Sequence, residues 1–146
     1  MSSQLTFADL MAKVEMLCSA AHLLLDHGDT GSAANRAYYA MHNAACVALI
    51  VSGVQEPDTH SGLIRMFGLH LVKNGPLPSE MAEILGREQR ARIIADYKST
   101  SIKTTVAKEL VEQAENFVAS IKALQFDKQP DPPKQEPTSG SSFDLS

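Results

Sequence analysis

The stretch SAANRAYYAMHNAACVA, residues 32–48, decides how this chain folds. Its alanines lie at positions 33, 34, 37, 40, 44, 45 and 48, and Asp29, Thr30 or Ser32 can cap a helix that runs to about Ser52 and Gly53. So many small side chains let neighbouring backbones approach closely. We therefore expect this helix to be central in the fold or to form a face for self-association.

Helical periodicity continues on both sides of this stretch. A helix from Phe7 should end at His27 and Gly28, and its apolar residues recur in a 3-1-3 spacing at positions 7, 10, 11, 14, 17, 18, 21, 24 and 25. Further helices are predicted over about 60–73, capped by Asp58 or Thr59, over about 79–96, and over about 103–125. No strand-like alternation occurs, so the predicted fold is all-α, an antiparallel bundle of four long helices and one short helix.

The composition fits one domain followed by a tail. At 146 residues, 44% hydrophobic and without Trp, the chain can build one core from aliphatic side chains. We assign residues 1–126 to the bundle and expect residues 127–146, rich in Pro, Ser and charge, to be disordered.

Several functional classes find no support in the sequence. The net charge of -4 gives no global attraction for nucleic acid, so any such contact must be local. Cys18 and Cys46 lie in apolar helical runs, and no metal or cofactor motif is present, so we expect neither a metal nor a cofactor. No stretch is long and apolar enough to span a membrane, which makes a cytoplasmic location the default expectation.

Polar residues concentrate unusually in the alanine-rich helix: Arg36, Tyr38, Tyr39, His42 and Asn43. Arg36 and Asn43 are seven apart and share a face, whereas Tyr38 and His42 form an i, i+4 pair. One interpretation is structural, with packed tyrosines and an Arg that pairs with a carboxylate from another helix. The other is a phosphodiester site, because Arg is a permanent planar cation and His moves protons near neutral pH.

The predicted fourth helix carries a second candidate group. Its apolar stripe leads to Glu88 and Arg92, which are i, i+4, and Asp96 continues this ladder. A structural ion pair is one interpretation, and a carboxylate partner for Arg36 is another. Arg87, Arg90 and Lys98 form the only basic cluster of the body, which is either a solvated face or one that faces RNA.

Four segments together resemble the HEPN domain family of small bacterial helical proteins. They are Asn35–Met41 (NRAYYAM), Thr59–Gly62 (THSG), Phe67–Gly75 (FGLHLVKNG) and Arg92–Tyr97 (RIIADY), and the similarity spans roughly residues 7–125. The resemblance implies a bundle that dimerises, so that the second helices of two subunits meet.

The resemblance also implies an activity. Many family members are metal-independent endoribonucleases, often toxins of toxin–antitoxin or defence modules, with an Arg followed after four to six residues by His. Arg36 and His42, with five residues between them, fit this pattern as the catalytic pair. The candidates for substrate-binding or supporting roles are Asn43, Tyr38, Tyr39, Asp96, Arg92 and Glu88.

The implied reaction leaves a 2′,3′-cyclic phosphate at a composite site of a homodimer. The implied partners are RNA and a cognate antitoxin, for which a nucleotidyltransferase is one candidate. The alternative is a non-catalytic HEPN module that binds a nucleotide or a protein. In similar sequences Phe often occupies the position of His42, and His or another residue occupies the position of Asn43. Relative to that pattern the His is shifted by one place, about 100° around the helix.

Overall fold

The computed structural model describes residues 6–98 and 102–124, and for residues 91–98 only the course of the helical backbone. It contains the helices α1 (Phe7–Asp26), α2 (Thr30–Val51), α3 (His60–Phe67), α4 (Ser79–Lys98) and α5 (Thr104–Lys122), with the π-helical segment η1 (Gly68–Lys73) following α3 directly. Within the described residues there is no strand, which confirms the predicted all-α bundle. The predicted tail, residues 127–146, lies outside the described residues.

The two long helices α1 and α2 are bounded by local signals that the sequence carries. Thr6 and Asp9 form a reciprocal capping box at the start of α1, and the Asp29 side chain accepts a hydrogen bond from the backbone N–H of Ser32 at the start of α2. Gly28 and Gly53 follow the two helices with φ of 84° and 86°, a conformation that favours glycine. Both predicted helices are confirmed.

The third helical segment departs from the expectation of one regular helix over 60–73. Thr59 caps it as predicted, but its last six residues, Gly68–Lys73, form a π-helix. Beyond it, the backbone N–H groups of Asn74 and Leu77 donate to the carbonyls of Leu69 and Leu71. A Cβ at Gly75 would lie 2.5 Å from the His70 carbonyl oxygen, so only glycine allows this close return of the chain.

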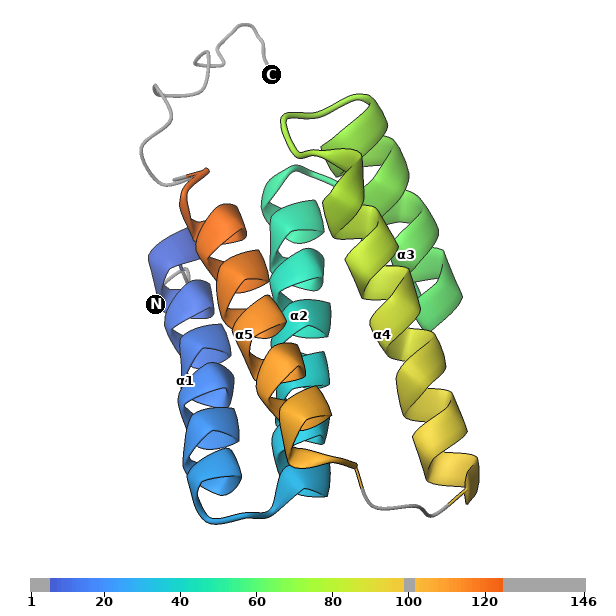
Figure 1. Ribbon diagram of the computed structural model, residues 1–146. Helices are drawn as coiled ribbons and strands as arrows, with labels where there is room; N and C mark the ends of the chain where they lie inside the picture. Colours follow the sequence, from blue (N-terminus) through green and yellow to red (C-terminus); the bar gives the residue numbers. More distant parts are fainter. Residues whose placement is uncertain (1–5, 99–101, 125–146) are drawn as a thin grey trace, which may run out of the picture.

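The helices form two groups that share one core (Figure 1). α1, α2 and α5 pack together, with α1 antiparallel to both neighbours, while α3 and α4 form an antiparallel pair against α2. Phe67 of α3 stacks on Phe117 of α5 with ring centroids 5.6 Å apart, which joins the two groups. As predicted, α2 is the central helix, and its fully buried alanines are Ala33, Ala37, Ala40, Ala44, Ala45 and Ala48.

Replacing Ala44 with Leu should destabilise the protein by about 1–3 kcal/mol, because the added atoms have no space between α2 and its neighbours. Chemical denaturation monitored by circular dichroism measures the change. Ala12→Leu, at an exposed position of α1, is the matched control and should stay within about 0.5 kcal/mol of wild type. Equal effects of the two substitutions would contradict close packing around α2.

Candidate functional site

One stripe of the central helix remains open to solvent. Its exposed residues are Ser32, Arg36, Asn43 and Ile50, and the partly buried Tyr39 and Cys46 lie between them at spacings of three or four. Arg36 and Asn43 therefore share an exposed face, as predicted. Arg36 forms no ion pair with any residue whose side chain the structure describes.

His42 lies next to this stripe, on the side of α2 that faces α3. Its ring centroid is 4.5 Å from that of His60 and 5.9 Å from that of Tyr38. The Tyr38 hydroxyl is hydrogen-bonded to Nδ1 of His60 at 2.8 Å, and Tyr38 is only 4% exposed. Tyr38, His42 and His60, which we call the histidine cluster, thus bring two imidazoles from two helices to one place.

His60 was not among the site residues predicted from the sequence. It belongs to the segment Thr59–Gly62, which carries part of the family resemblance. One signal in the sequence could have indicated His60: it directly follows the helix cap Thr59, so it is the first residue of α3. What brings it to Tyr38 and His42 is the course of residues 52–59, and no local pattern predicts that course.

Cys46 contacts the other side of His42. Its Sγ lies 4.0 Å from the His42 Nδ1, one turn further along α2. Burial, with a smaller contribution from Glu56, raises the pKa of the Cys46 thiol to about 11. The thiol is therefore protonated at neutral pH and unsuited to act as a nucleophile.

Glu88 points into the bundle, as the apolar stripe of α4 predicts, and is 6% exposed. Burial raises the pKa of its carboxyl group, and Arg87 partly opposes this effect. No ion pair joins Glu88 to Arg36 among the described side chains. The side chains of Arg92 and Asp96, predicted to continue this ladder, lie outside the described residues.

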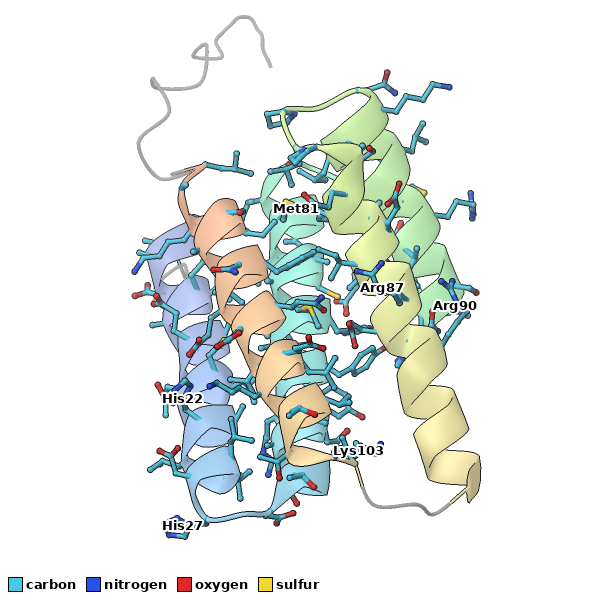
Figure 2. The ribbon with its side chains drawn as sticks, viewed as in Figure 1. His22, His27, Met81, Arg87, Arg90 and Lys103 are labelled. Atoms are coloured by element: carbon cyan, nitrogen blue, oxygen red, sulfur yellow. The ribbon has the colours of Figure 1, made fainter. Side chains whose placement is uncertain are left out.

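Arg87 and Arg90 are exposed on α4, one turn apart (Figure 2). Two exposed carboxylates, Glu80 and Glu83, precede them on the same face, so the positive charge is confined to the turn that holds the two arginines. Lys98, the third member of the predicted basic cluster, has a side chain outside the described residues. The guanidinium groups of Arg87 and Arg90 are exposed and can bind phosphate groups.

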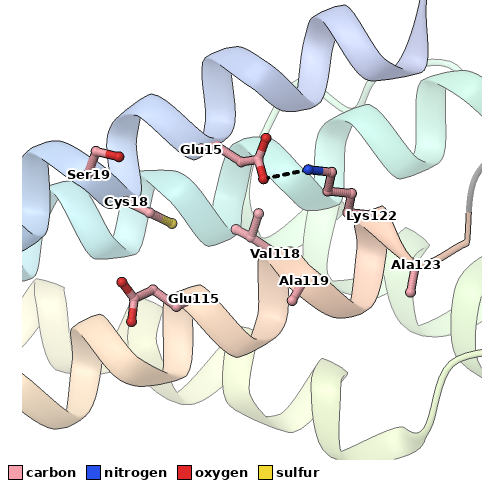
Figure 3. A pocket seen from close by; sticks show the side chains of 8 residues that line it. All are labelled: Glu15, Cys18, Ser19, Glu115, Val118, Ala119, Lys122 and Ala123. Carbon is pink, nitrogen blue, oxygen red and sulfur yellow. Dashed lines mark hydrogen bonds and ion pairs between the residues drawn. The ribbon is translucent and has the colours of Figure 1, made fainter.

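A groove between α1 and α5 lies on a different part of the bundle (Figure 3). Glu15 and Glu115 line it, each in an ion pair of 2.9 Å, with Lys122 and with His22 respectively. The one lysine that lines the groove, Lys122, is already paired with Glu15, so the groove offers little positive charge to a phosphodiester. None of the predicted site residues lines it.

Among the described residues, no group of three or more His, Cys, Asp or Glu side chains is arranged to hold a metal ion. None of the helices in the described ranges is long and apolar enough to cross a membrane.

The structure is that of a small helical-bundle protein whose central helix carries Arg36 and His42 on adjacent faces. Comparison with known sequences identifies its family. The HEPN domain profile matches residues 8–135, so this chain belongs to the HEPN domain family. The family resemblance of the sequence is thereby confirmed.

Curated relatives agree with this family. "UPF0332 protein glr0978" of Gloeobacter violaceus is 33% identical over 112 residues, 75% of this chain and 88% of the relative. "Putative toxin MJ0605" of Methanocaldococcus jannaschii is 33% identical over 104 residues, 71% of this chain and 77% of the relative. "UPF0332 protein PH1297" of Pyrococcus horikoshii is 45% identical over 67 residues, and this match spans about half of each chain, 46%.

Replacing Glu88 with Gln should stabilise the protein at neutral pH and change little in acid. Since burial raises the pKa of Glu88 above the ordinary 4.5, the folded state binds the proton more tightly than the unfolded state. Stability is therefore lost as the pH rises from about 4.5 through the folded-state pKa, and Gln removes this loss. Melting temperatures of wild type and Glu88→Gln at about pH 4 and about pH 7.5 measure this difference in stability.

The control is Glu83→Gln, at an exposed position of the same helix, which should not change the pH dependence. A Glu88→Gln protein that melts below wild type at neutral pH would mean that the carboxylate is held there in its charged form.

Proposed function

We propose that this protein is a metal-independent endoribonuclease that acts as a homodimer and serves as the toxin of a toxin–antitoxin or defence module in the cytoplasm. The observation that carries the proposal is an exposed Arg36, unpaired among the described side chains, on the same helix as a partly buried His42. Arg provides a fixed positive charge for phosphate oxygens, and His transfers protons near neutral pH. Relatives named as toxins support the biological role.

The chemistry needs no metal. His42 takes the proton of a ribose 2′-OH, the oxygen attacks the adjacent phosphorus, and Arg36 stabilises the negative charge of the pentacoordinate phosphate. The product ends in a 2′,3′-cyclic phosphate. DNA lacks the 2′-OH and is not cleaved. Asn43, exposed beside His42, orients the phosphate, and the partly exposed Tyr39 stacks on a base.

The geometry of α2 favours a site built from two copies of the chain. The six residues from Arg36 to His42 rise by about 9 Å along the helix axis. Both side chains lean toward the N-terminus of the helix, so their direction does not close this separation. A second α2 packed antiparallel across a two-fold axis brings Arg36 of one copy toward His42 of the other, which gives the composite site.

The open stripe of α2 is the surface that this dimer would bury. It carries small, polar and apolar side chains, including Ile50 at 45% exposure, and no acidic residue. The absence of acidic side chains along the stripe keeps it compatible with both a second copy and an RNA backbone.

Replacing Ile50 with Lys should weaken the dimer by roughly tenfold or more, since each copy would bury a lysine at one end of the antiparallel interface. Sedimentation equilibrium measures the dissociation constant. Met16→Lys is the matched control, because Met16 is 70% exposed on α1, away from the stripe, and its replacement should leave the dimer intact. A monomeric wild-type protein, or an Ile50→Lys dimer as tight as wild type, would exclude this interface.

The purified protein should cleave single-stranded or loop RNA in EDTA and leave 2′,3′-cyclic phosphate ends. His42→Ala should slow cleavage by roughly 10²–10⁴-fold through loss of the general base. Arg36→Ala should slow it by about 10²–10³-fold through loss of charge stabilisation. Denaturing gels with end-labelled RNA measure the rates, and circular dichroism verifies the helical fold of each variant.

The matched controls are His27→Ala and Arg65→Ala, both at exposed positions outside the site, which should cleave as wild type does. Cleavage that survives in both site variants would exclude Arg36 and His42 as the catalytic pair.

A non-catalytic module is the alternative, and one observation favours it: His42 packs against Tyr38 and His60 and is only partly exposed. For such a module, no RNA product forms at any protein concentration, and expression is harmless to cells. A bound nucleotide such as ATP would then raise the melting temperature, because a ligand that binds the folded state stabilises it.

A further inference from the structure

His60 is held rigidly at the start of α3. The Thr59 side chain accepts a hydrogen bond of 2.9 Å from the backbone N–H of Gly62 and so caps the helix whose first residue is His60. A Cβ at Gly62 would lie 2.8 Å from Thr59 Oγ1. Because glycine has no side chain, the Thr59 hydroxyl can approach the backbone this closely. The cap therefore fixes the backbone at His60 relative to the first turn of α3.

Tyr38 fixes the ring of His60. The hydroxyl of this buried tyrosine is 2.8 Å from the His60 Nδ1, and the two rings stack at 6.0 Å with planes 30° apart. Nδ1 donates to the hydroxyl oxygen when it carries a proton, and it accepts from the hydroxyl when it does not. In either state Nδ1 is engaged by Tyr38, so Nε2 is the nitrogen that can exchange a proton with a substrate.

The ring of His42 lies beside this fixed imidazole, with centroids 4.5 Å apart and planes tilted by 49°. Both histidines are partly exposed, whereas Tyr38 below them is buried. Two partly exposed imidazoles from two helices thus lie next to each other. A cluster that served packing alone would need only one of them to satisfy the Tyr38 hydroxyl.

Cleavage of RNA by its own 2′-OH needs two proton transfers. The attacking oxygen loses a proton, and the leaving 5′-oxygen must gain one to depart easily. The attacking and leaving oxygens lie on opposite sides of the phosphorus, so the base and the acid are two different groups a few ångströms apart. Imidazole, with an ordinary pKa of about 6.5, provides both a base and an acid near neutral pH.

We propose that His60 is the general acid of this reaction, with His42 as the general base and Tyr38 as the residue that positions His60. This assignment rests on the proposed endoribonuclease function. The proton of the 2′-OH moves to His42, and the bond between the 2′-oxygen and phosphorus forms. The bond from phosphorus to the 5′-oxygen breaks, and that oxygen takes the proton from Nε2 of His60. A neutral His60 and a protonated His42 remain, and exchange with water restores both.

The test uses a leaving group that needs no acid. An RNA that the wild-type protein cleaves is prepared with sulfur in place of the 5′-oxygen at the scissile bond. A thiolate leaves without protonation, because the pKa of a thiol is only about 8.5. His60→Asn removes Nε2 but keeps a polar atom near the position of Nδ1 to satisfy Tyr38.

On the natural RNA, His60→Asn should be slower than wild type by roughly 10²–10⁴-fold. On the sulfur-containing RNA it should cleave within about tenfold of wild type, because the acid is no longer needed. His42→Asn, which lacks the base, should be slow on both substrates. His70→Gln, in the segment that continues α3, is the matched control and should cleave both as wild type does.

Three outcomes overturn the assignment. If His60→Asn cleaves natural RNA at the wild-type rate, His60 is not the general acid. If it is equally slow on both substrates, the substitution has disturbed the structure of the site and has not removed an acid. Where His60→Asn does not fold by circular dichroism, His60→Gln is used in the same comparison. A wild-type protein that cleaves neither RNA overturns the proposed function itself, and with it the role of His60.

Discussion

The close approach of α2 to α1 and α5, lined by alanine, is the constraint on which the rest of the structure depends. Six alanines of α2 have no exposed surface, and side chains from α1, α3, η1, α4 and α5 complete the same core, to which Met41 and Leu49 of α2 also belong. Since alanine adds almost no bulk, the backbones themselves come near one another, and dispersion contacts accumulate along the whole length of the helices. A larger side chain on this face would move every neighbouring helix.

The same packing separates the polar residues of α2 into two environments. Arg36 and Asn43 lie on the open stripe, where a charged or polar side chain keeps its hydration. Tyr38 and His42 lie on the side of α3, where Tyr38 is buried and must find a hydrogen-bond partner. His60 is that partner, so satisfying one hydroxyl is also what brings a second imidazole to the site.

Much of this fold could be predicted, because its helix boundaries follow from local chemistry. Thr6, Asp29 and Thr59 cap their helices, and Gly28 and Gly53 follow α1 and α2. The π-helical turn of η1 could not be predicted, since it depends on how the chain returns at Gly75. The contact between Tyr38 and His60 spans 22 residues, and periodicity within one helix carries no information about it.

The position of His42 itself has a physical consequence. A histidine at position 43 would lie on the open stripe, two helical turns beyond Arg36, whereas position 42 is turned by about 100° toward α3. There the ring contacts His60, Tyr38 and the Cys46 sulfur, and these contacts restrict its rotamers. At position 42 the ring is less exposed to solvent than Asn43 and is held beside a second imidazole. A shift of one residue along a helix can therefore replace a lone histidine by a pair of histidines, provided that the next helix supplies the second ring.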